Sequence, residues 1–190
     1  MVKNIVMEIK ITSRHILKVL ELLSWIIFIG LSIEAGAIIF SAVYTFAITP
    51  ANTHRFWEGI DLSPLYHYDR GQFIVMVLLV SIVGLLKAIL FYLIVKLFSE
   101  KKWDMARPFS ATLKRFLSGA GYLTLGIGLF THYGSDYAEW LSKQQVTMPD
   151  LHALHLDGAD VWIFMAVIMF VVAQLVQKGI TLQHENDLTI

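Results

Sequence analysis

Two charged residues interrupt long apolar stretches of this chain. Glu34 lies inside FIGLSIEAGAIIF, residues 28–40, and Lys87 lies inside a second stretch of similar character. An isolated charge at the centre of a bilayer costs about 2.5–3.5 kcal/mol on insertion scales, and a partner of opposite charge removes much of that cost. We therefore expect Glu34 to face Lys87 as a buried charge pair. Such residues also mark ion, proton or substrate paths, so a small transporter or channel built on this pair is one alternative function.

Residues that could bind a metal follow position 150. His152 and His155 are three positions apart, which on a helix would place them on one face, and Asp157 could add an oxygen ligand. The set is compatible with zinc or copper, but no fixed third ligand accompanies it, and histidines are also common in wet interfacial loops. We predict no cofactor. An outer-face metal-binding protein or enzyme that uses His152 and His155 is the second alternative.

Motifs of known enzyme classes do not occur in the sequence. It has no Walker-type phosphate loop, no HExxH, no GxSxG and no dinucleotide fingerprint. It also has no cysteine, which excludes disulfides, thiolate metal sites and cysteine nucleophiles. The sequence therefore favours a protein that is not an enzyme.

Composition indicates which elements position these residues. The chain has 190 residues, of which 56% are hydrophobic and 16% are charged, whereas soluble domains have about 25% charged residues. A bilayer core needs roughly 20 apolar residues of helix. We predict a single-domain, all-α, integral membrane four-helix bundle with spans at about residues 20–46, 73–98, 116–133 and 159–176. Segments 47–72 and 134–158 are then outer loops, 99–115 is an inner loop, and 177–190 is a cytoplasmic tail.

Lysine and arginine are unevenly divided between the two sides of this arrangement. Most of them lie before the first span, around the loop 99–115 or after the last span. Short cytoplasmic loops carry the excess of these residues in membrane proteins. We therefore expect a multi-pass protein with both termini in the cytoplasm and the lipid bilayer as its first partner.

Small residues are concentrated in the third predicted span. Ala120, Thr124 and Gly128 are four positions apart, and Gly121 and Gly126 lie on flanking faces. This spacing lets helices approach closely in lipid. We expect these residues to serve helix packing rather than to line a pore.

Two segments on the inner side carry a family resemblance. KKWDMARPFSATLKRFLSGAGYL follows the second span, and LVQKGITLQHENDLTI closes the chain. Together with the order of the four spans, they resemble the bacterial membrane family called domain of unknown function 2975 (DUF2975). The inner-face motif is Arg107, Pro108, Phe109, Lys114 and Arg115, and the C-terminal motif is Lys178, Gly179, Leu182, Gln183, Glu185, Asn186, Asp187, Leu188, Thr189 and Ile190.

The resemblance implies a four-helix protein of the bacterial inner (plasma) membrane without assigned chemistry. Members are often encoded beside a small Cro/CI-like helix-turn-helix regulator. A sensor or regulatory membrane protein that docks this partner, with no direct nucleic acid binding of its own, is therefore the leading expectation. A homo-oligomer would be needed if the chain encloses a transport path.

The two inner motifs also suggest a structural role. Pro108 suits the first turn of a helix, and Gly179 is placed where a helix could end. The acids Glu185 and Asp187 would then reach the basic loop 99–115. We predict that the tail folds back on this loop as a clasp or docking site, and a frayed, solvated end is the alternative.

Overall fold

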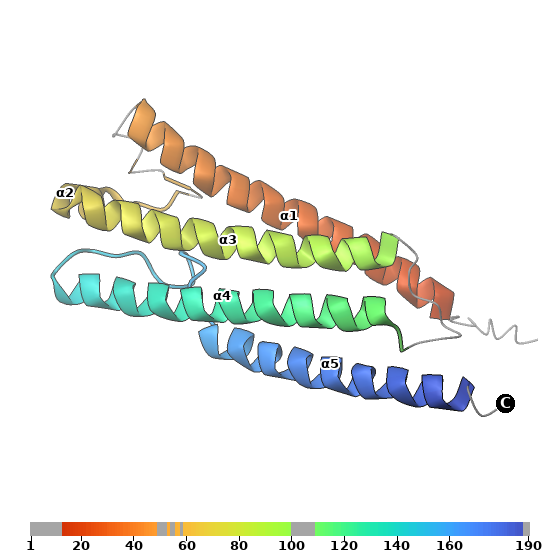
Figure 1. Cartoon of the computed structure of the whole chain (residues 1–190). Coiled ribbons are helices and arrows are strands. Elements are labelled where there is room, and N and C mark those ends of the chain that lie inside the picture. The colour runs from red at the N-terminus through yellow and green to blue at the C-terminus, as the bar shows by residue number, and fades with distance from the viewer. Residues whose placement is uncertain (1–12, 49–52, 54–55, 58, 100–108, 188–190) are drawn as a thin grey trace, which may run out of the picture.

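The computed structural model describes residues 13–48, 53, 56–57, 59–99 and 109–187 (Figure 1). These residues form helices and connecting loops without any strand. The helices are α1 (Ser13–Ala47), α2 (Ser63–Tyr68), α3 (Arg70–Ser99), α4 (Ala111–Lys143) and α5 (Ala159–Asp187). The end at which α1 finishes and α3 begins is called the outer end below, after the predicted topology, and the opposite end is called the inner end.

Three of these helices are long and apolar enough to cross a membrane. They comprise 32 residues of α1 (Ile16–Ala47), all 30 residues of α3, and 27 residues of α5 (Ala159–Glu185). Backbone polar groups have no water partners in hydrocarbon, so uninterrupted helices are the structure that apolar segments of this length adopt there. Helix α4, which contains the predicted span 116–133, is not among the three, since glycine and polar residues lower its hydropathy.

The four long helices form an open row. Helix α1 packs against α3, α3 against α4, and α4 against α5, with the short α2 beside α3 (Figure 1). Within the described ranges, α5 does not return to pack against α1. The four long helices are thus present as predicted, but the predicted four-helix bundle is not confirmed.

This arrangement leaves much apolar surface outside the protein core. In the most apolar stretch of α3, which lies inside the row, 50% of residues are buried, whereas the corresponding values are 11% for α1 and 17% for α5. Lipid tails are as apolar as leucine side chains. A bilayer would therefore cover the faces of α1 and α5 that the protein leaves open.

Small residues let α4 approach both of its neighbours. Ala120, Thr124 and Gly128 are buried, which confirms their predicted packing role. Of the flanking glycines, Gly121 lies against the Phe170 ring of α5, and Gly126 lies against Leu86 of α3. The same helix therefore presents one small face to α3 and another to α5.

Gly128 provides a test of this packing. A Cβ at this position would lie 2.6 Å from Ile163 Cγ1, 3.0 Å from the Ile163 backbone nitrogen and 3.2 Å from the Ala159 carbonyl oxygen. Backbone atoms cannot move aside as a flexible side chain can, so we expect Gly128→Ala to lower the free energy of unfolding by about 1–3 kcal/mol. Denaturant unfolding in detergent, followed by circular dichroism, measures the change.

Gly36→Ala is the matched control, because a Cβ at Gly36 would meet nothing within 4 Å. Alanine is favoured over glycine in a helix interior by about 0.8–1 kcal/mol, so this variant should be as stable as the parent or more stable. Equal behaviour of the two variants would contradict close packing at Gly128.

Candidate functional site

The loop between α4 and α5 folds back between the helices (Figure 1). Leu154 and Leu156 hold it in place, with exposures of 2% and 0%. Leu156 packs against Gly134 of α4, where a Cβ would lie 3.0 Å from a Leu156 methyl carbon. His155 lies between these leucines with a φ of 54°, in the left-handed region that residues other than glycine seldom adopt. The two buried neighbours thus determine where His155 is presented.

His155 joins the two charged residues that interrupt the apolar stretches. Its Nδ1 lies 2.5 Å from Glu34 Oε1, and since a carboxylate only accepts hydrogen bonds, Nδ1 carries the donated hydrogen. Its backbone carbonyl accepts a hydrogen bond of 3.2 Å from Lys87 Nζ. The His155 and Glu34 side chains are 33% and 18% exposed. One loop residue therefore provides a polar partner for both charges.

The expected direct pair of Glu34 and Lys87 is replaced by this bridge. The two residues lie at similar levels, because α1 and α3 meet where Gly84 of α3 approaches Ala35 of α1. A Cβ at Gly84 would lie 3.7 Å from the Cα of Ala35. Glu34 also attracts Lys87 electrostatically, as does Asp157. The hydrogen-bond partner of each charge, however, belongs to His155.

The direction of α3 explains how Lys87 reaches the loop. Side chains on a helix lean towards its N-terminus, and the N-terminus of α3 is at the outer end. The long methylene stem lets the ammonium extend outwards along apolar surface. A backbone carbonyl outside a helix is costly in an apolar environment unless it has a donor. Lys87 is that donor for His155.

Two tryptophans enclose the cluster. The Trp57 ring contacts the His155 ring edge to face, with centroids 5.0 Å apart and an interplanar angle of 87°. The Trp162 ring of α5 lies 5.8 Å from Lys87 Nζ, a distance at which a cation is attracted to an aromatic face. We refer to Glu34, Trp57, Lys87, His155 and Trp162 as the outer cluster. It joins α1, α3, α5 and both outer loops.

The geometry does not support the metal hypothesis for this loop. Residues 151–155 form turns rather than a helix, so the prediction that His152 and His155 share a helical face is wrong. His152 is exposed, and the His155 ring is engaged by Glu34. Nowhere in the described ranges do three or more His, Asp or Glu side chains lie together in a way that could hold a metal ion.

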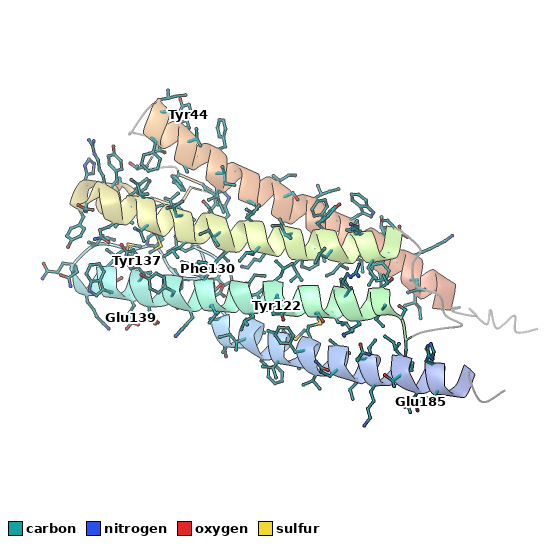
Figure 2. The ribbon with its side chains drawn as sticks, in the orientation of Figure 1. Tyr44, Tyr122, Phe130, Tyr137, Glu139 and Glu185 are labelled. Carbon is teal, nitrogen blue, oxygen red and sulfur yellow. The ribbon has the colours of Figure 1, made fainter. Side chains whose placement is uncertain are left out.

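Beyond the predicted third span, Tyr137 joins the outer ends of α4 and α3. Its hydroxyl donates to Gln72 Oε1. Burial raises the pKa of Tyr137, and Tyr133 and Asp69 raise it further. The hydroxyl therefore keeps its proton at neutral pH and remains a donor. Figure 2 shows Tyr137 and Glu139 at this end of the molecule and Glu185 at the other.

At the inner end, the two sequence motifs meet. The Phe109 ring packs against Gly179 of α5, where a Cβ would lie 2.7 Å from ring carbons. Helix α5 continues through Gly179 to Asp187, so the prediction that a helix ends at Gly179 is wrong. The glycine is explained by the close approach of Phe109 rather than by a helix cap. Sequence reasoning placed both residues at the inner side but did not pair them.

A groove of about 500 Å³ lies over this contact. Leu175 and Leu182, which are seven residues apart on α5, are 61% and 59% exposed. Lys178 lies between them and is exposed. All lining residues except Leu175 belong to the two motifs. The groove is lined by Phe109, Leu175, Lys178, Gly179, Leu182 and Gln183.

Other motif residues are only partly described. Helix α4 begins at Ala111 behind an N-cap at Ser110, whose hydroxyl accepts from the Leu113 N–H. Lys114 is half-buried and Arg115 is exposed in the first turns of α4, and Glu185 is exposed near the end of α5. The predicted clasp involves the loop 99–115, most of which lies outside the described residues. Arg107, Pro108, Leu188, Thr189 and Ile190, with the side chains of Asn186 and Asp187, also lie outside them.

The three apolar helices place this chain among helical proteins compatible with a membrane. More particularly, residues 53–190 match the family model described as protein of unknown function (DUF2975), and the chain belongs to that family. No curated protein and no solved structure matches it. The matched region includes α2 to α5, Lys87, His155 and both inner motifs. Helix α1, with Glu34, precedes it.

The bridge through His155 changes what a charge exchange should do. A direct pair would survive the exchange of Glu34 and Lys87, but a lysine at position 34 cannot accept from His155, and a glutamate at position 87 would face a carbonyl oxygen. We expect Glu34→Lys combined with Lys87→Glu to be at least as destabilised as either single variant. Each loses about 1–3 kcal/mol through an unsatisfied buried group, which denaturant unfolding in detergent measures.

The exposed pair Glu139 and Lys143 is the control. Their charged atoms lie 3.2 Å apart with no third residue between them, and both side chains are about two-thirds exposed. Exchanging these two residues should change stability by less than about 0.5 kcal/mol. Recovery of stability in the Glu34 and Lys87 double variant would overturn the bridge.

Proposed function

We propose that this chain is a regulatory protein of the bacterial inner membrane, which crosses the bilayer four times and docks a cytoplasmic protein in its inner groove. One observation carries the proposal: the two motifs that distinguish the sequence line the same groove. Phe109 and Gly179 are 70 positions apart in the numbering and yet are in contact. A surface that two separate motifs combine to form is a candidate for binding.

The position of α4 supports four crossings. This helix packs between α3 and α5, so a bilayer that surrounds those two helices would also meet the free side of α4. Tyr122 and Leu129 on that helix are 69% and 54% exposed, which suits contact with lipid. An even number of crossings puts both termini on one side. The distribution of lysine and arginine favours the cytoplasm as that side.

Labelling of single cysteines tests this topology, and the absence of native cysteine makes the parent chain a clean background. Lys18 and His184 are exposed near the inner ends of α1 and α5, and His152 is exposed at the outer end. We expect a membrane-impermeant maleimide to label His152→Cys in spheroplasts, and Lys18→Cys and His184→Cys only after permeabilisation. If α4 does not cross, positions 18 and 184 will label on opposite sides.

The groove has the chemistry to bind an amphipathic helix. Such a helix places apolar residues in a hydrophobic groove, and here Leu175, Leu182 and Phe109 offer apolar contacts while Lys178 can pair with an acid. The family resemblance supports one occupant, a surface helix of a small helix-turn-helix regulator. Helix α5 also connects this groove to the outer cluster, since Trp162 lies near its start and Lys178 near its end. A change at the outer end therefore has a rigid element through which to reach the partner.

Engagement of both membrane charges argues against the transporter alternative. Glu34 and Lys87 each bind His155, so each has a structural partner. A path enclosed by several copies of the chain would need these charges to face an aqueous passage. Docking at the inner groove requires no such rearrangement.

Binding to a small helix-turn-helix regulator tests the docking proposal. With the full chain in lipid nanodiscs and the purified regulator in solution, Lys178→Glu should weaken binding at least about tenfold, because it replaces an attraction with a repulsion at a close contact. Lys143→Glu makes the same charge change at the outer end of α4 and should leave the Kd unchanged. Microscale thermophoresis measures both.

Leu182→Ser removes an exposed apolar contact without adding a charge and should also weaken binding. Unchanged affinity in both Lys178→Glu and Leu182→Ser would overturn the groove as the docking site. Loss of self-association in these variants, without any effect on regulator binding, would instead make the groove an interface between copies of the chain.

A further inference from the structure

We propose that the second outer loop, residues 144–158, is a proton-sensitive latch. When the His155 imidazole is protonated, it holds the loop on Glu34 of α1, and loss of the proton weakens this contact and lets the loop and α1 separate. The latch does not depend on the groove or on its partner. It assigns to His155 a sensing role beyond its structural contact.

Charged side chains lie around His155. Glu34 faces it from α1, and Lys87 faces its carbonyl from α3. Asp157 of the same loop acts on Lys87. When the imidazole is protonated, the negative charges of Glu34 and Asp157 are balanced by the positive charges of Lys87 and His155. When the imidazole is neutral, one negative charge is left in excess.

Among the described residues, the other contacts of His155 and Lys87 are with aromatic rings. The first outer loop contributes the Trp57 ring, and α5 contributes the Trp162 ring beside Lys87. Helix α4 meets the loop through Gly134, against which Leu156 packs. The His155 side chain is 33% exposed.

The backbone of the loop opposes the latched state. His155 has a φ of 54°, and a residue other than glycine in the left-handed region is strained. The bond to Glu34 acts together with the buried Leu154 and Leu156 to hold the loop against that strain. Deprotonation removes the positive charge of the imidazole and with it the Coulomb attraction to Glu34, so the balance shifts towards release.

The dependence on pH follows from this contact. Histidine side chains change charge between about pH 5 and 8. The protonated imidazole binds Glu34 as an ion pair, so the latched state is favoured at low pH and is lost as the pH rises. Helix α5 begins four residues after His155, which places the latch at the start of the helix that reaches the inner groove.

Distance measurement between spin labels tests the latch in the full chain. The labels are attached to Val43→Cys on α1 and His152→Cys in the loop, both at exposed positions, in a chain that has no other cysteine. In lipid nanodiscs we expect a short distance at pH 5.5 and a growing second population at a longer distance at pH 8.5. The ratio of the two populations should change by about fivefold, as expected for the loss of one partly exposed ion pair.

His155→Asn separates sensing from folding. Asparagine tolerates the left-handed backbone and keeps an N–H donor for Glu34, but it does not titrate in this range. The labelled variant should show the same mixture of short and long distances at pH 5.5 and pH 8.5, close to that of the parent chain at pH 8.5, because its donor is neutral at both pH values. Glu34→Gln should lower the short-distance population at pH 5.5 towards its value at pH 8.5.

His132→Gln is the matched control, since His132 is exposed on α4 beside Asp136, at 3.6 Å, and does not contact the loop histidine. It should leave the pH response intact. A response that persists in His155→Asn, or a parent chain whose distances are the same at both pH values, would overturn the latch. Helical content measured by circular dichroism at both pH values verifies that each variant is folded.

Discussion

A carboxylate and an ammonium set among apolar helices need polar partners, and one loop residue provides both. Glu34 accepts from the His155 ring, and Lys87 donates to the His155 carbonyl. Neither charge is then left unsatisfied, which would cost more than the bonds themselves contribute. The same two bonds hold a non-helical loop between the helices. Within the described residues, α1 packs on α3 alone among the helices, and His155 adds a loop contact to it.

This contact also joins a helix that precedes the family match to a loop that lies within it. The family match begins at residue 53, so Glu34 lies before it and His155 lies within it. The outer cluster therefore attaches α1 to the matched region at its outer end, in addition to the packing of α1 on α3. Because the long helices form an open row, α1 and α5 have few protein neighbours. Individual polar contacts consequently carry more of the tertiary specificity than they would in a closed bundle.

Helix α5 runs from the outer cluster to the inner groove. It starts beside the outer cluster, and its final turns form the inner groove with Phe109. Glycines serve close packing along this path, because Gly128 of α4 lets α5 approach and Gly179 of α5 lets the Phe109 ring approach. Helix α5 continues unbroken through Gly179. An unbroken helix can transmit a shift at one end to the other, which a helix ending at Gly179 could not.

Hydrophobic length is a local property, and the apolar segments around Glu34, Lys87 and residues 159–176 could therefore be read directly as helices. The packing role of the small residues of α4 and the similar levels of Glu34 and Lys87 could also be predicted from the sequence, because helical rise is constant. The path of a loop is not local. Glu34 and His155 are separated by 121 positions, and no pattern in the sequence indicates that residues 144–158 turn back between the helices. The sequence by itself determined a helical membrane protein with two charges at matching levels. The tertiary structure alone decided that His155 lies between these charges and that Phe109 packs on Gly179. Both contacts depend on where the connecting segments place side chains that are far apart in the sequence.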